Sequence, residues 1–219
     1  MFNSRLNQWP IVTLLFIAIN VYIFMHGSNL VGSDPFGTPT IAQIEEYNRN
    51  TIGSQPSLLL ASMFHTIEHA SFTHLATNMV AFLIIGGVVE TFMIRSLYIV
   101  FILVAMLVTG VNVHETSKML TVGASGIDFA MMTLTLPVML MGIVIYKKFL
   151  LSIPLVMYMV LLIFCVQATL TTPNISNGGH FSGMVFGLIF GCFMVLGQLE
   201  LRYKVKNIIM PFSSKNKEE

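Results

Sequence analysis

The sequence predicts an all-α membrane protein built as a bundle of six transmembrane helices. Three observations support this prediction: the composition, the number of long apolar segments, and the distribution of basic residues. Of 219 residues, 55% are hydrophobic and only 10% are Asp, Glu, Lys or Arg, whereas soluble domains carry charge at about a quarter of their positions. A soluble globule of this size would lack the polar residues to cover its surface.

The composition also excludes other classes of protein. Intrinsic disorder requires low hydrophobicity and high net charge, and a formal net charge of +1 leaves no basic surplus for binding nucleic acid. Cys165 and Cys192 both lie in apolar runs, so no disulfide framework is indicated. We expect the lipid bilayer to surround most of the chain.

Six segments contain the roughly 20 mostly apolar residues that a membrane helix requires. They are residues 10–26, 73–93, 96–113, 123–146, 149–170 and 178–199. Pro137 in the fourth segment and Pro154 in the fifth are tolerated in membrane helices, because neighbouring groups satisfy the freed backbone. Residues 27–72 form a long first loop, in which Leu58–Phe64 is apolar but too short to span and is expected to lie along the interface.

The basic residues orient this bundle. Six spans place both termini on one side of the membrane, and nine of the eleven Lys and Arg residues fall on that side: Arg5, Arg95, Lys147, Lys148, Arg202, Lys204, Lys206, Lys215 and Lys217. Only Arg49 and Lys118 fall on the other side. The positive-inside rule therefore predicts cytoplasmic termini, with an N-terminal segment at 1–9, a membrane domain at 10–200 and a polar tail at 201–219.

Three polar clusters occur at the outer ends of the spans that run inward from the external face. Polar side chains inside spans are costly and usually mark function. The clusters are His65, His69, His74 and Asn78; Gly123–Gly126; and Asn177–His180. Because these spans run in the same direction, the topology brings the three clusters to one membrane depth.

Ser125 begins the fourth span. A serine at a helix N-terminus is usually a cap, but this one is flanked by Gly123 and Gly126, which permit a tight turn and close backbone approach. The same pattern is typical of the nucleophile turn of serine hydrolases, where backbone N–H groups beside the serine receive an oxyanion. This motif alone is a weak signal.

His180 begins the sixth span, where a histidine is often only an interhelical hydrogen-bond partner. Three glycines follow on the same face at offsets 3, 7 and 11: Gly183, Gly187 and Gly191. Such a face permits close packing, and Gly126 and Ala130 offer a matching small face on the fourth span. Packing the two faces together would bring Ser125 within reach of His180, whose imidazole can take the serine proton and return it to a leaving amine.

His74 and Asn78 lie one turn apart on the second span. Both can donate hydrogen bonds to an oxyanion, for which one donor is typically worth about 3 kcal/mol; the alternative is a structural contact between helices. No acid is placed as a third catalytic residue. Phe129, one turn after Ser125, is a candidate to stack on the imidazole.

Together these residues resemble the rhomboid family of intramembrane serine proteases. The matching residues are His69, His74 and Asn78, then GGVVE at 86–90, GASG at 123–126, and NGGH at 177–180 followed by Gly183 and Gly187. The resemblance implies a six-helix bundle in a bacterial plasma membrane with its active site toward the external side. It implies cleavage of single-pass transmembrane proteins by a Ser–His dyad, without a metal or another cofactor.

Carried over by position, the resemblance makes Ser125 the nucleophile and His180 the general base. His74, Asn78 and the Ser125 backbone N–H would form the oxyanion hole. Structural roles are implied for Gly123, Gly126, Phe129, Gly183, Gly187 and Glu90. The chain departs from the family at its only tryptophan, Trp9, where many bacterial members have a Trp-Arg pair in the first loop. Asp128 also occupies a usually apolar position; it is either a protonated or cavity-facing acid without catalytic consequence, or a residue that tunes His180 or the water supply.

Three rival functions stay open. His65-Thr66-Ile67-Glu68-His69 fits the H-x-x-E-H pattern of one class of zinc metalloprotease, although that class does not explain the GASG motif or the glycine face. A proteolytically inactive relative that binds membrane clients is the second alternative, although such proteins usually lose the serine or the histidine. A transporter is the third, but no paired broken helices occur in inverted halves.

Overall fold

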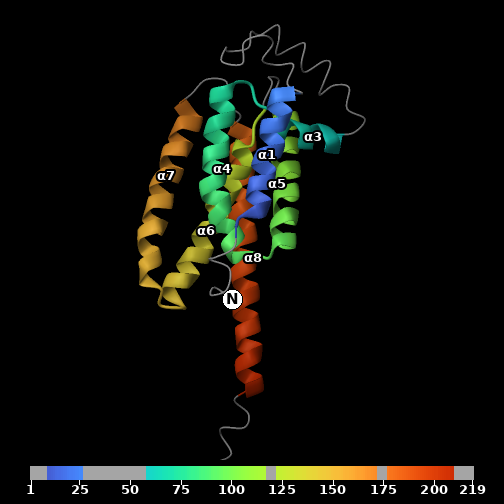
Figure 1. The fold of residues 1–219 in the computed structure, drawn as a ribbon. Coiled ribbons are helices and arrows are strands. Elements are labelled where there is room, and N and C mark those ends of the chain that lie inside the picture. The colour runs from blue at the N-terminus through green and yellow to red at the C-terminus, as the bar shows by residue number, and fades with distance from the viewer. Residues whose placement is uncertain (1–8, 27–57, 117–121, 172–176, 210–219) are drawn as a thin grey trace, which may run out of the picture.

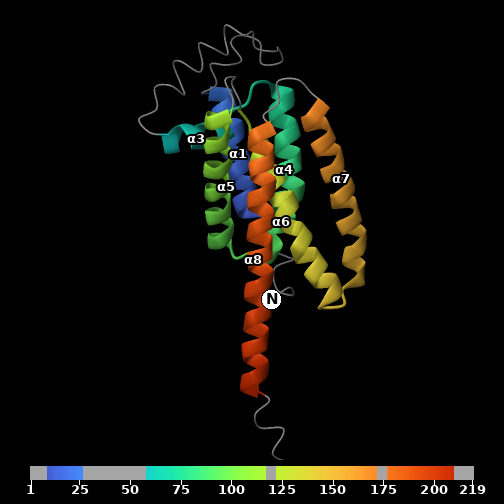
Figure 2. The ribbon, with the colours of Figure 1, turned by 180° about the vertical axis from the view of Figure 1, so that it is seen from behind.

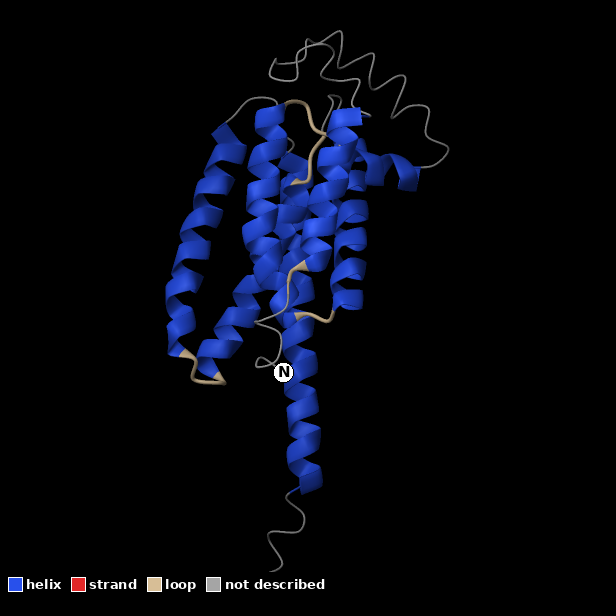
Figure 3. Cartoon of the chain, in the orientation of Figure 1, coloured by secondary structure: helices blue, strands red, loops and turns tan. Residues whose placement is uncertain are grey.

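The structure is a computed structural model that describes residues 9–26, 58–116, 122–171 and 177–209. All regular elements in these ranges are helical (Figures 1 and 3), which confirms the all-α prediction for this part of the chain. The elements are α1 (Ile11–His26), α3 (Leu58–Ile67), α4 (Phe72–Phe92), α5 (Arg95–Thr116), α6 (Ser125–Val144), a short 3₁₀ turn η2 (Phe149–Leu151), α7 (Ser152–Thr171) and α8 (Asn177–Ile209).

Four of the described helices are long and apolar enough to cross a membrane: α4, α6, α7 and residues 177–200 of α8. Helix α1 and residues 95–111 of α5 are also apolar but shorter, so the count of six spans stays a prediction. The predicted segments agree with the observed helices to within three residues at every end but one. Helix α8 continues to Ile209 because no glycine or proline interrupts it after Gly197, so the segment assigned to the tail begins as helix.

Helix α6 lies at the centre of the bundle. It contacts α3, α4, α5, α7 and α8 and is the most deeply buried of the four long helices. Figures 1 and 2 show α7 standing to one side, joined to α6 at the end opposite α3. Helices α4, α6 and α8 all begin toward the end at which α3 lies, whereas α1 begins and α8 ends at the opposite end (Figure 1). The three polar clusters therefore lie toward the same end.

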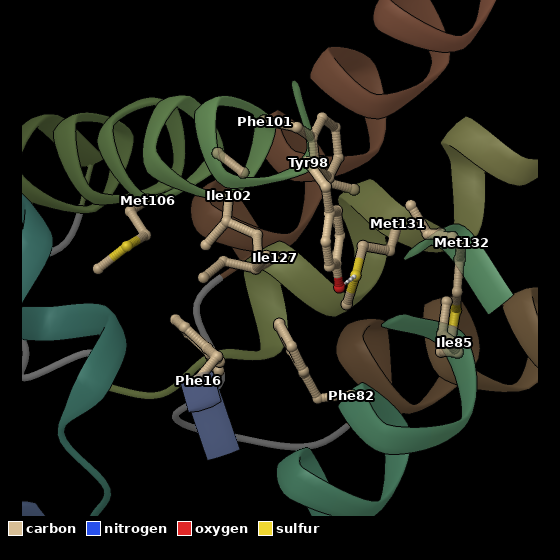
Figure 4. Packing of buried hydrophobic residues seen from close by; sticks show 14 of the residues in the cluster. Phe16, Phe82, Ile85, Tyr98, Phe101, Ile102, Met106, Ile127, Met131 and Met132 are labelled. Atoms are coloured by element: carbon tan, nitrogen blue, oxygen red, sulfur yellow. Dashed lines mark hydrogen bonds between the residues drawn. The ribbon is translucent and has the colours of Figure 1, made fainter. Parts of the chain in front are cut away.

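The core is formed by large side chains from α1, α4, α5 and α6 (Figure 4). Phe82, Tyr98 and Phe101 are fully buried, and the ring of Phe16 stacks on that of Phe82 with centroids 4.3 Å apart. The Tyr98 hydroxyl lies 3.4 Å from the sulfur of Met131, which it faces in Figure 4. Between membrane helices such packing contributes through van der Waals contact rather than removal of surface from water.

Glu90, near the end of α4, joins α4 to the start of α1. Its buried carboxylate accepts hydrogen bonds from the backbone N–H groups of Val12 at 3.1 Å and Thr13 at 2.9 Å, and from the Thr13 hydroxyl at 2.9 Å. Arg95 Nε lies 3.6 Å from the same carboxylate. The first N–H groups of a helix lack intrahelical partners and attract negative charge. Glu90 therefore caps α1, as expected of the structural residue that the resemblance implied.

Candidate active site

A tight turn leads into α6 and presents Ser125. Gly123 has φ of +123°, a conformation that side-chain-bearing residues rarely adopt, and its N–H donates to the carbonyl of His65 at 2.9 Å. The N-cap of α6 is Ala124, which supplies no side-chain cap. Ser125 is thus the first residue of the helix rather than its cap, and its hydroxyl is directed elsewhere.

The Ser125 hydroxyl contacts the imidazole of His180. Oγ of Ser125 lies 2.7 Å from Nε2 of His180, although the residues are 55 positions apart in the sequence. His180 lies in the first turn of α8 and is buried, whereas Ser125 is half-buried. The predicted contact between these two side chains is therefore present.

Close packing of α6 on α8 produces this contact. A Cβ on Gly183 would overlap the carbonyl of Gly126, and one on Gly187 would overlap the carbonyl of Ala130. A Cβ on Gly191 would lie 2.6 Å from the carbonyl oxygen of Leu134. The Thr133 hydroxyl also donates to the carbonyl of Met184 at 2.8 Å. The predicted packing of the two small faces is confirmed.

Two further side chains hold the imidazole of His180. The Phe129 ring lies with its centroid 4.5 Å from that of the imidazole, at an interplanar angle of 33°. The Thr169 hydroxyl, from α7, lies 2.8 Å from Nδ1. Both ring nitrogens of His180 therefore have hydroxyl partners, and one face of the ring is covered by an aromatic side chain.

His74 and Asn78 lie against the turn that precedes Ser125. A Cβ on Gly123 would lie 2.8 Å from Nε2 of His74 and 3.0 Å from Nδ2 of Asn78. Ser71 caps α4 by accepting from the His74 N–H at 3.2 Å, which sets the start of this helix beside the turn. Two side chains that can donate hydrogen bonds thus lie beside the turn that leads into α6.

His69 orients the amide of Asn78. Nδ2 of Asn78 lies 3.1 Å from Nε2 of His69, which is completely buried. Burial, together with the nearby His74, lowers the pKa of His69 to about 3, so its imidazole is neutral and Nε2 is available to accept from the amide. The edge of this ring also faces the ring of His74, with centroids 5.3 Å apart.

The hydrogen bonds of His180 are made with two hydroxyl groups, and Asp128 is not one of its partners. Asp128 is buried at 4% exposure, and its Oδ1 has no hydrogen-bond partner among the described residues. The H-x-x-E-H residues are also buried, but His69 is engaged by Asn78. No three His, Cys, Asp or Glu side chains in the described part of the chain are grouped so that they could hold a metal ion.

Sequence reasoning missed Thr169 and the role of His69 as the partner of Asn78. His69 belonged to a polar cluster, so its spacing from Asn78 was a usable signal. Thr169 carries no such signal, since a threonine in a membrane helix commonly bonds only to its own backbone. Its contact with His180 depends on how α7 is placed beside α8.

Comparison with known proteins identifies a family. The model of the rhomboid domain matches residues 57–197, a range that begins just before α3 and ends within α8. No match was found among curated proteins.

Proposed function

This chain belongs to the rhomboid family, and from that premise we propose that it is an intramembrane serine endopeptidase that cleaves transmembrane proteins. The observation that carries the proposal is the 2.7 Å contact between Ser125 Oγ and His180 Nε2. Hydrogen-bonded nucleophile and base side chains are the structural requirement for activating a serine hydroxyl at neutral pH.

In the proposed reaction, His180 Nε2 takes the Ser125 proton as Oγ attacks the carbonyl carbon of the scissile peptide. The tetrahedral intermediate collapses when the imidazolium returns this proton to the leaving amine, which leaves an acyl group on Ser125. Water, deprotonated by the same imidazole, then hydrolyses the ester and regenerates the hydroxyl. No step requires a metal or another cofactor.

His74, Asn78 and the backbone N–H of Ser125 stabilise the oxyanion of this intermediate. The two side chains lie against Gly123, two residues before the nucleophile. The bond between His69 and Asn78 holds the amide in place before the substrate binds. Donors that are already oriented stabilise developing charge without a reorganisation cost.

The site also constrains the substrate. We assign six spans to the chain from its apolar segments and cytoplasmic termini from the basic-residue asymmetry. In this arrangement Ser125 would lie toward the external side of what we take to be a bacterial plasma membrane. Single-pass membrane proteins are the proposed substrates. A helical segment hides its peptide bonds in hydrogen bonds, so residues that break the helix near the cut favour cleavage.

Fluorophosphonate labelling of the purified protein tests the proposal, because these probes react only with an activated serine. We expect labelling of the wild type, none of Ser125→Ala or His180→Ala, and undiminished labelling of Ser182→Ala. Ser182 is the matched control because its hydroxyl donates to a carbonyl of its own helix, that of Gly179. The same variants should show the same order in cleavage of a single-pass reporter protein.

Two outcomes would contradict the proposal. A folded wild-type protein that takes no label and cuts no reporter is the result expected of an inactive client-binding relative. Cleavage that survives in Ser125→Ala and is lost with a chelator would instead support the metalloprotease reading of His65, Glu68 and His69.

A further inference from the structure

Thr169 is the one buried residue among those described in α7, at 3% exposure. The rest of this helix is largely exposed, and Figures 1 and 2 show it at one side of the bundle. The Thr169 hydroxyl makes two contacts: 2.8 Å to Nδ1 of His180 and 2.9 Å to the carbonyl oxygen of Cys165, one turn earlier. The outlying helix thus places a polar group against the imidazole of the dyad.

The two contacts of Thr169 assign the proton on the imidazole. A hydroxyl has one proton to donate, and the carbonyl of Cys165 can only accept. With the hydroxyl proton donated to this carbonyl, the oxygen lone pairs face Nδ1, which then carries the hydrogen of the second bond. A neutral imidazole has a single N–H, so Nε2 is free to accept from the Ser125 hydroxyl at 2.7 Å.

We propose that Thr169 is a positioning residue that holds His180 in the Nδ1–H tautomer and orients Nε2 toward Ser125. The inference rests on the proposed protease function and extends it, because it supplies a third group where the sequence offered no acid. In serine hydrolases the third catalytic residue orients the base and sets its tautomer. Here a neutral hydroxyl fills this role.

Thr169 acts in both protonation states of the imidazole. When Nε2 takes the Ser125 proton, Nδ1–H continues to donate to Thr169 Oγ, and the hydroxyl continues to donate to the Cys165 carbonyl. A chain of hydrogen bonds polarises each member, so this chain stabilises the imidazolium while no proton leaves Nδ1. Phe129 lies against one face of the ring and Thr169 bonds to Nδ1 at its edge, so both restrict the orientation of the imidazole.

Labelling kinetics with a fluorophosphonate probe test the role, with the maximal rate kinact and the probe affinity KI measured separately. Thr169→Val keeps the branched shape and removes the hydroxyl; we expect kinact to fall about tenfold, the rate equivalent of one ordinary hydrogen bond, with KI unchanged. Thr169→Ser should restore most of the rate. The matched control is Thr171→Val, whose exposed hydroxyl donates to the carbonyl of Gln167 and which should label as the wild type does.

The tautomer is measured independently by the imidazole ¹⁵N resonances of His180, assigned by their loss in His180→Ala. We expect protonated Nδ1 in the wild type and in Thr169→Ser, and a mixture of tautomers in Thr169→Val. If the wild type is labelled, three results would overturn this proposal alone. They are an Nε2-protonated His180, a normal labelling rate in Thr169→Val, and an equal loss of rate in Thr169→Val and Thr169→Ser. Absence of labelling in the wild type would overturn the protease function and, with it, this role.

Discussion

Gly183 of α8 lies directly on the carbonyl of Gly126 in α6, with no room between them for a single methyl group. Gly126 follows Ser125, and Gly183 comes one turn after His180. The distance between the nucleophile and the base is therefore determined by how closely two backbones approach. Any residue that separates these helices changes the geometry of the proposed dyad without touching either of its members.

Gly183→Ala is expected to lower the rate of fluorophosphonate labelling by about 10²-fold, because a misplacement of about 1 Å between reacting groups costs that much. The added Cβ would overlap the Gly126 carbonyl, so α6 and α8 must move apart. The matched control is Gly197→Ala in the same helix, where nothing lies within 4 Å of the added atom. Equal labelling of both variants would show that this approach does not set the geometry.

Asn78→Ala is expected to slow labelling by about 10²–10³-fold, the usual cost of one oxyanion donor. His69→Leu should slow it less, because His69 acts only by orienting the Asn78 amide through the 3.1 Å contact. The double variant should then be no slower than Asn78→Ala, since residues that act through one contact are not additive. The labelling rates of the wild type, the two single variants and the double variant give the coupling between His69 and Asn78. If the two losses of rate simply multiply in the double variant, this coupling is excluded.

Glu90→Gln is expected to lower the free energy of unfolding by about 1–3 kcal/mol, the range for leaving a buried donor without its acceptor. The carboxylate accepts three hydrogen bonds from the first turn of α1, and an amide cannot accept all of them. Thr13→Val removes one of the three donors and should have a smaller effect. Thermal unfolding in detergent measures both; an unchanged Tm in Glu90→Gln would show that the cap is not needed.

The stability of the protein is expected to fall as the pH drops below about 6.5. The pKa of His69 is about 3 in the folded state and about 6.5 when unfolded, so between these values the unfolded chain binds a proton that the folded protein does not. The folded state then loses up to about 1.4 kcal/mol per pH unit as the pH falls.

The measurement for this pH effect is Tm between pH 7 and pH 4. In His69→Gln, which keeps a hydrogen-bond acceptor but does not titrate, the decrease should be shallower. His26→Gln removes an exposed histidine in α1 and serves as the control that should follow the wild type. A decrease equally steep in His69→Gln would assign the acid sensitivity to other groups.

Much of the fold followed from one-dimensional patterns. The apolar segments predicted helix limits to within three residues at nearly every end, because a membrane requires long, uninterrupted apolar helices. The end of α8 was missed, since a helix that leaves the apolar region continues until its sequence supplies a breaker. The six-span count rests on the apolar segments and the orientation on the basic residues, and both stay predictions.

The pairing of Ser125 with His180 was also visible in the sequence, because two faces of small residues allow the backbones of their helices to approach closely. The contacts of Thr169 and His69 were not visible. Each contact depends on the rotation of a helix about its axis and on its distance from a neighbouring helix. Apolar composition determines neither of these when most faces of a membrane helix are equally hydrophobic.

The sequence alone determined the order of the helices and the spacing of Gly123, Ser125, His180 and Gly183. Membrane thickness and the helical repeat relate this spacing to the depth of each residue in the membrane and to the face of the helix on which it lies. Only the tertiary structure decided which hydroxyl meets Nδ1 of His180, that Glu90 caps α1, and that Asp128 is buried without a partner for Oδ1. These relationships are set by packing between helices distant in sequence, where displacements of an ångström separate a hydrogen bond from no contact.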